Sequence, residues 1–181
     1  MSKITLTIDN KKVQVNDGAT VLDAAEEIGI EIPTLCYHPD LTIHGACRVC
    51  VVENEENGKL LASCCTPAVD GMTINTRSSK ARKARRRNVK LLLANHPNDC
   101  LGCDRNGSCE LQDITYSLGI NNDDMDELRG ETREHSIDDT GPSLKRDPNK
   151  CILCGRCVRV CEEVQGVSAL QFSVRGFDTV V

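Results

Sequence analysis

Four cysteines near the C-terminus form the most specific pattern in this 181-residue chain. They follow the spacing Cys-x2-Cys-x2-Cys-x3-Cys, at Cys151, Cys154, Cys157 and Cys161. Soft thiolates at this spacing are ligands of a 4Fe–4S cluster, and a tight loop lets the first three converge on one face of it. Cys161 is expected on a helix that leaves the loop, where it ligates a neighbouring cluster. A structural zinc knuckle is the alternative for such a run.

A second group of cysteines lies in the first third of the chain. Its members are Cys36, Cys47, Cys50 and Cys64, with ten, two and thirteen residues between them. Two thiolates on one tight loop and two from elsewhere are a usual ligand supply for an iron–sulfur cluster. Gly45 and Ala46 precede Cys47, so the small side chains leave backbone amides free to donate hydrogen bonds to cluster sulfurs. A zinc site is again the alternative, although zinc more often uses two close cysteine pairs.

A third group combines one histidine with three cysteines. His96 stands before Pro97, which ends the preceding helix. The cysteines follow at gaps of three, two and five residues, at Cys100, Cys103 and Cys109. A neutral imidazole in place of an anionic thiolate changes the net charge of a cluster and tunes its potential. The four residues are predicted ligands of another 4Fe–4S cluster, with a zinc site as the alternative.

The composition favours metal ligation over disulfides as the role of the twelve cysteines. The N-terminus opens no apolar signal region, and no apolar stretch approaches the length of a membrane span. We therefore expect a cytoplasmic protein with no membrane partner, in which cysteines bind metal. With two Tyr, two Phe and no Trp, the chain has few large side chains for a hydrophobic core. Metal coordination would therefore add stability that the small core does not provide.

The net charge of −5 conceals two opposed blocks. Residues 77–90 carry eight Lys and Arg and no acid, whereas the charged residues of 121–139 are mostly acidic. The basic block has no interleaved aromatics and the chain is acidic, so no nucleic-acid partner is predicted. The block is interpreted as a solvated face or a docking surface for an acidic partner subunit. No Walker loop, GxGxxG fingerprint, nucleophile elbow or catalytic carboxylate pair occurs, so we predict no catalytic residue.

The residues around the first cysteine group predict a small β-grasp domain. Residues 4–8 alternate apolar and polar side chains, and residues 13–15 do the same after an Asp9-Asn10 turn, which predicts a hairpin. Thr20 is expected to cap a helix that Gly29 ends. A cysteine-bearing loop and three short strands are expected next, at 32–46, 49–52, 59–62 and 72–75.

Two further helices are expected downstream. One begins at Ser78–Ser79 and runs through the basic block to about Asn95, and the other covers residues 109–118. The chain is thus predicted to be α+β, in four parts. These are a β-grasp 2Fe–2S ferredoxin-like domain (1–77), a small helical histidine-ligated 4Fe–4S domain (78–120), an exposed connector (121–149) and the first half of a bacterial-ferredoxin-like 4Fe–4S domain (150–181).

The three groups together resemble the N-terminal iron–sulfur module of the catalytic subunit of multimeric iron-only (FeFe) hydrogenases. The order of sites is the same, and the stretch Cys151–Gly166 is most similar to the hydrogenases. NAD-dependent formate dehydrogenase alpha subunits and the large iron–sulfur subunit of NADH–quinone oxidoreductase share the module, but in the latter the position of Cys161 is usually not cysteine. In the family segment that matches Ser63–Pro67 the first cysteine is the ligand, which implies Cys64 rather than Cys65.

The resemblance also implies a function and partners. The chain would relay electrons through a 2Fe–2S cluster and at least two 4Fe–4S clusters in a cytoplasmic NAD(P)H-linked, electron-bifurcating hydrogenase complex. Its partners would be a flavin- and NAD(P)-binding subunit, a small 2Fe–2S subunit and ferredoxin. The same relay in a formate dehydrogenase or a complex I-like enzyme stays open. The alternative from a different functional class is a protein-interaction module that is stabilised by zinc and carries no electrons.

The C-terminal run departs from the family pattern. Both hydrogenases and formate dehydrogenases continue with a second cysteine run, whereas no cysteine follows Cys161 here, and Glu162 stands where the common run has proline. We therefore expect the natural protein to extend beyond Val181. Its next cysteine run is expected to supply the fourth ligand of the cluster at Cys151, Cys154 and Cys157.

Overall fold

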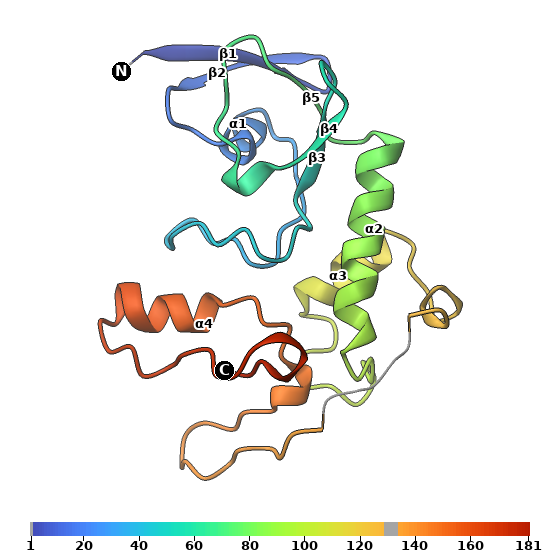
Figure 1. Cartoon of the computed structure of the whole chain (residues 1–181), viewed down its shortest axis with the longest axis vertical. Helices are drawn as coiled ribbons and strands as arrows, with labels where there is room; N and C mark the ends of the chain where they lie inside the picture. The colour runs from blue at the N-terminus through green and yellow to red at the C-terminus, as the bar shows by residue number, and fades with distance from the viewer. Residues whose placement is uncertain (1, 129–133) are drawn as a thin grey trace. The chain divides into compact units, whose positions relative to one another are not determined.

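The computed structural model describes residues 2–128 and 134–181 and divides the chain into two compact units (Figure 1). Unit 1 comprises Met1–Tyr37 and Ile43–Asn88, and unit 2 comprises His38–Thr42 and Val89–Val181. The division falls inside helix α2 (Ser79–Ala94), so the predicted boundary at 77/78 does not coincide with it. The four-part domain division stays a prediction.

Unit 1 contains a five-stranded mixed sheet. Its strands are β1 (Lys3–Ile8), β2 (Lys11–Asn16), β3 (Val51–Asn54), β4 (Lys59–Ala62) and β5 (Thr73–Asn75), in the order β2-β1-β5-β3-β4. β1 and β5 are parallel, with Thr7 opposite Thr73, and the other neighbouring strands are antiparallel. Helix α1 (Val21–Glu27) packs against the sheet (Figure 1). A mixed sheet with one packed helix is the predicted α+β, β-grasp arrangement.

The hairpin and the first helix form as the sequence predicts. Asp9 and Asn10 have φ of 47° and 65°, the left-handed pair that a two-residue hairpin turn requires. Thr20 Oγ1 accepts a hydrogen bond from Asp23 N at 3.2 Å, and Thr20 N donates to Asp23 Oδ2 at 2.8 Å. This reciprocal capping satisfies two donors that the helix leaves unpaired. Gly29, at φ 68°, reverses the chain after the helix.

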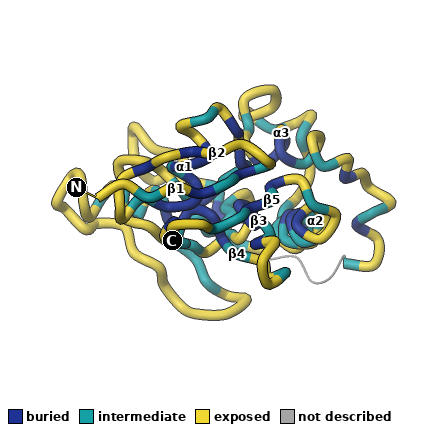
Figure 2. The backbone as a smooth tube through the Cα atoms, turned by 90° about the horizontal axis from the view of Figure 1, so that it is seen from above, coloured by how far each residue is buried: buried dark blue, intermediate teal, exposed yellow. Residues whose placement is uncertain are grey.

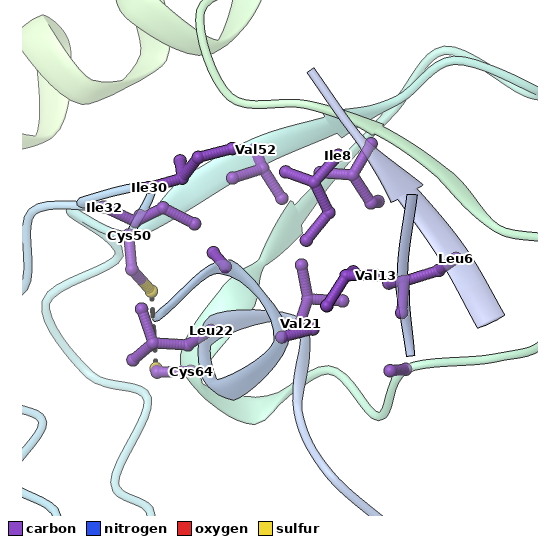
Figure 3. Packing of buried hydrophobic residues seen from close by; sticks show 14 of the residues in the cluster. Leu6, Ile8, Val13, Val21, Leu22, Ile30, Ile32, Cys50, Val52 and Cys64 are labelled. Carbon is purple, nitrogen blue, oxygen red and sulfur yellow. Dashed lines mark hydrogen bonds between the residues drawn. The ribbon is translucent and has the colours of Figure 1, made fainter. Parts of the chain in front are cut away.

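One hydrophobic core fills unit 1. Apolar side chains of β1, β2, α1 and β3 interdigitate, and Cys50 and Cys64 belong to the same cluster (Figure 3). Figure 2 shows buried segments in dark blue along the strands and α1. Residues 162–178, by contrast, are all exposed. β3 begins at Val51 rather than Val49, because the residues before it turn to carry the cysteines.

Unit 2 consists of short helices joined by irregular segments. The C-terminal turns of α2 are followed by α3 (Glu110–Ser117), and α4 (Arg156–Arg159) continues into a π-helical turn (Val160–Val164). Three-residue 3₁₀ turns occur at Asp123–Met125, Pro148–Lys150 and Gly176–Asp178. None of the helices in the described ranges is long and apolar enough to cross a bilayer.

The predicted connector over 121–149 begins with a packed turn. Met125 is buried, and Lys90 Nζ lies 2.9 Å from Asp124 Oδ1. Met125 gives this acidic segment an apolar contact, so the start of the connector is packed rather than exposed as predicted. Residues 129–133 of the connector lie outside the described residues.

Candidate metal centres

In unit 1 the four predicted ligands form two pairs of sulfurs. The Sγ atoms of Cys50 and Cys64 lie 3.3 Å apart, and both side chains are only 1% exposed (Figure 3). Cys36 and Cys47 form a second hydrogen-bonded pair. Each iron of a 2Fe–2S cluster takes two protein ligands, so two pairs of thiols fit this group.

The pairing also favours thiolates. The hydrogen bond with Cys47 lowers the pKa of Cys36 to about 5, and the hydrogen bond with Cys64 lowers the pKa of Cys50 to about 6. The same bonds raise the pKa of Cys47 and of Cys64. One member of each pair is therefore a ready thiolate, the form that binds metal.

Cys65 has a different hydrogen-bond partner from the members of these pairs. Its Sγ donates a weak hydrogen bond to Ala62 O at 3.6 Å. It also lies against the cysteine loop, since a Cβ added at Gly45 would be 3.4 Å from Cys65 Sγ. The 3₁₀ turn Ser63–Cys65 thus gives the two adjacent thiols different partners, Cys50 for Cys64 and Ala62 O for Cys65.

Helix α2 fixes the loop that carries Cys47 and Cys50. Arg85 Nε donates to Val51 O at 2.8 Å, and Asn88 Nδ2 donates to Arg48 O at 2.6 Å. Arg48 has φ 54°, a left-handed conformation that these contacts support. Sequence reasoning placed Arg85 in the solvated basic block, although its four-residue spacing from Ala81 marks it as part of the buried stripe.

In unit 2 the second group of predicted ligands lines one cavity of about 110 Å³. His96, Cys100, Cys103 and Cys109 all contribute to its wall, together with Lys150. A cavity bordered by one imidazole and three thiols suits a 4Fe–4S cluster. Asn98 stabilises the end of α2 beside it, because its Nδ2 donates to Leu93 O at 3.0 Å.

The surroundings of His96 favour the neutral imidazole. Burial lowers its pKa and Lys150 lowers it further, while a hydrogen bond with Asn98 and the charge of Asp147 act in the opposite direction. Its Nδ1 accepts a hydrogen bond from Asn98 N at 3.2 Å. A neutral ring is the state in which histidine ligates metal.

Gln112 supports the loop between Cys103 and Cys109, a role that the sequence analysis did not assign. Its side chain is buried, Nε2 donates to Asn106 Oδ1 at 2.9 Å, and Oε1 accepts from Gly107 N at 2.9 Å. The signal was available, because a glutamine on the inner face of a short helix needs nearby partners.

The third group comprises three thiols near one another and Cys161, whose surroundings differ, and its ligand assignment stays a prediction. Burial, then Cys154 and Cys151, raise the pKa of Cys157, so these three lie near one another. Gly155 has φ 70°, which lets the loop turn into α4. Cys161 lies in the π-helical turn, and its Sγ accepts a hydrogen bond from Ala169 N at 3.2 Å.

An ion pair connects the second and third groups. Arg156 Nη1 lies 2.9 and 2.7 Å from the two carboxylate oxygens of Glu110. Glu110 directly follows Cys109, and Arg156 directly precedes Cys157. The pair therefore joins the two cysteine motifs within unit 2.

No group of three or more His, Cys, Asp or Glu side chains surrounds a single metal-ion position in residues 2–128 and 134–181. An iron–sulfur cluster distributes its ligands over several irons, so paired sulfurs and a ligand-lined cavity are the relevant pattern. The sulfur pairs of unit 1 and the ligand-lined cavity of unit 2 suit clusters, and the individual ligands remain a prediction.

Comparisons with known proteins agree with this layout. Residues 1–79 match a 2Fe-2S iron-sulfur cluster binding domain, residues 85–124 the NADH-ubiquinone oxidoreductase-G iron-sulfur binding region, and residues 141–181 the ferredoxin-like domain of NADH-quinone oxidoreductase subunit 3. These domains confirm the expected 2Fe–2S and 4Fe–4S cofactors.

Several oxidoreductases contain a segment that is similar to this chain over almost all of its 181 residues. The chain is 44% identical to NADP-reducing hydrogenase subunit HndD of Solidesulfovibrio fructosivorans over 100% of its own length and 31% of that protein. It is 42% identical to the NADH-ubiquinone oxidoreductase 75 kDa subunit of Reclinomonas americana over 98% of its length and 25% of that protein. A crystal structure of an NAD+-reducing [NiFe]-hydrogenase contains a chain that is 37% identical, with a TM-score of 0.90 over 99% of this chain and 74% of that one. The chain thus spans less than a third of the length of HndD and of the 75 kDa subunit.

Proposed function

The chain belongs to the family of iron–sulfur modules shared by NAD(P)-reducing hydrogenases and the large iron–sulfur subunit of NADH–quinone oxidoreductase, and from this membership we propose that it relays electrons inside an NAD(P)-linked hydrogenase complex. The observation that carries the proposal is the succession of three thiol-rich sites on one chain, with none of the motifs of nucleotide or acyl chemistry. When bound, iron–sulfur clusters supply one-electron redox chemistry.

We propose three ligand sets for this relay. Cys36, Cys47, Cys50 and Cys64 bind the 2Fe–2S cluster; His96, Cys100, Cys103 and Cys109 bind a 4Fe–4S cluster; and Cys151, Cys154 and Cys157 bind another, with Cys161 directed to a neighbouring one. The two sulfur pairs of unit 1, the ligand-lined cavity of unit 2 and the separate bonding of Cys161 support these sets. The chain's own contribution is to supply thiolates, fix the loops and exclude water.

The partners belong to the same proposal. Two of the similar proteins are named as NADP- or NAD+-reducing hydrogenases, which favours a nicotinamide-linked complex over a formate dehydrogenase. We propose that a flavin- and NAD(P)-binding subunit exchanges the hydride, since residues 1–181 contain no flavin or nucleotide motif, and that a small 2Fe–2S subunit accompanies it. We place the complex in the cytoplasm, with ferredoxin as a further electron partner and iron-only hydrogen chemistry as its activity.

The test is electron entry into these clusters in the purified native complex. NAD(P)H and, separately, hydrogen should each reduce a 2Fe–2S and a 4Fe–4S cluster, and the EPR signals of the reduced clusters should then appear. Cys-to-Ser variants assign these signals to this chain. Turnover during which these clusters stay oxidised, or a complex with neither flavin nor a second subunit, would refute the proposal. A complex I-like role would instead give reduction by NADH and none by hydrogen.

A further inference from the structure

Arg85 is a cation inside the protein. Its side chain is only 7% exposed, and it lies on the same stripe of α2 as the fully buried Ala81 and Val89. Its Nε donates to Val51 O at 2.8 Å, while its Nη2 is buried with no hydrogen-bond partner in the described part of the chain. Guanidinium groups stay protonated in proteins, so a full positive charge is buried here.

A buried charge without a counter-charge costs several kcal/mol, so the position of Arg85 calls for an anion. No carboxylate forms an ion pair with it in residues 2–128 and 134–181. Asp9 is near, but its carboxylate accepts hydrogen bonds from the amide and hydroxyl of Thr76. The other anionic group that acts on Arg85 is the thiolate of Cys50, the residue before Val51.

We propose that Arg85 is the fixed counter-charge of the 2Fe–2S cluster and that it raises the cluster's midpoint potential. The inference rests on the proposed ligand set of unit 1. Four thiolates give the cluster a net negative charge, and reduction adds one more electron. A positive charge that water cannot screen stabilises the more negative, reduced form more than the oxidised one.

The same helix supplies matched controls. Arg82, Lys83 and Arg87 are exposed cations within three residues of Arg85. Salt and water screen charges at such positions. Removing one of them changes the formal charge of the chain equally but should hardly affect the cluster.

The experiment is a redox titration of the full chain with its clusters assembled, with dithionite as the electron donor and the EPR signal of the reduced 2Fe–2S cluster as the readout. In Arg85→Gln the ratio of reduced to oxidised cluster at a fixed potential should fall at least about tenfold, a shift of about 59 mV for one electron. Arg85→Lys, Arg82→Gln and Arg87→Gln should stay within about threefold of the parent.

Each outcome of this titration either supports or overturns the role of Arg85. An Arg85→Gln chain with full cluster content and a ratio within threefold of the parent overturns the inference, as does an equal shift in Arg82→Gln. If Arg85→Gln does not retain the cluster, Arg85→Lys decides, because a tenfold fall despite the retained charge would assign the role to hydrogen bonding alone. Absence of any 2Fe–2S signal in the parent chain would instead refute the proposed function.

Discussion

The adjacent thiols Cys64 and Cys65 allow a sharp test of the 2Fe–2S ligand set. We expect Cys64→Ser to abolish the cluster and Cys65→Ser to leave it intact. Cys64 lies in the core with its sulfur 3.3 Å from that of Cys50, whereas Cys65 bonds weakly to Ala62 O at 3.6 Å. The turn that carries both residues buries Cys64 and leaves Cys65 partly exposed.

The expected magnitudes follow from these surroundings. Loss of one of four ligands should remove about two irons per chain, the content of a 2Fe–2S cluster. In the metal-free protein Cys64→Ser buries a hydroxyl among apolar side chains, which costs about 1–3 kcal/mol if the hydroxyl finds no partner. Cys65→Ser exchanges a weak donor for a stronger one beside the same carbonyl, so its effect should stay within about 0.5 kcal/mol.

Iron analysis and EPR of the dithionite-reduced chain measure the cluster, and urea unfolding of the metal-free chain measures stability. Cys65→Ala serves as a control for the loss of any side-chain donor at that position. The reverse pattern, with the signal lost in Cys65→Ser and kept in Cys64→Ser, would refute the assignment. Loss in both variants would mean that the turn needs both thiols and that the geometric argument is incomplete.

Four further outcomes are expected. Thr20→Ala should destabilise metal-free unit 1 by about 1 kcal/mol in urea unfolding, because it removes the reciprocal cap with Asp23, and an unchanged midpoint would contradict this. His96→Cys should keep a 4Fe–4S cluster at a lower potential in an EPR titration, since an anionic ligand favours the oxidised state, and an unchanged potential would count against ligation. The chain Met1–Val181 should bind about six irons firmly and a third cluster weakly, because Cys161 bonds to Ala169 N; a stable count near ten with Cys161 as a ligand would show that the third site closes on itself. Removal of iron should expose the amides of α3 to hydrogen exchange while those of β1 stay protected, and equal protection would refute the dependence of unit 2 on metal.

Local signals explain what the sequence could predict. The alternation in residues 4–8, the Asp9-Asn10 turn and the Thr20–Asp23 cap each act within a few residues, so short-range rules suffice. The same holds for the cysteine motifs, whose ligands come mostly from single loops. The limits of the helix at 79–94 likewise follow from the Ser78 cap and Pro97, and the end of the helix at 110–117 follows from Gly119.

Long-range contacts explain what it could not. The parallel pairing of Thr7 with Thr73 joins distant segments, and nothing local specifies it. Arg85 was assigned to the basic block, and its spacing from Ala81 is the one local sign of its burial; its hydrogen bond to Val51 O joins residues 34 apart, and no local rule predicts it. The pairing of Cys50 with Cys64 rather than Cys65 depends on the direction of the turn at 63–65, which spacing does not reveal.

The two units differ in what stabilises them, and this bears on how the clusters are retained. The hydrophobic core cluster lies wholly in unit 1, and two of the proposed ligands are part of it. In unit 2 the buried apolar side chains of the described residues are Val89, Leu93, Leu111, Ile114, Ile120 and Met125. So small an apolar interior is insufficient for a segment of this length, because each ordered residue costs about 1–2 kcal/mol of backbone entropy. With the proposed ligand sets, coordination by the histidine and cysteines would supply much of the order of unit 2, whereas in unit 1 the folded core positions the thiols before any metal binds.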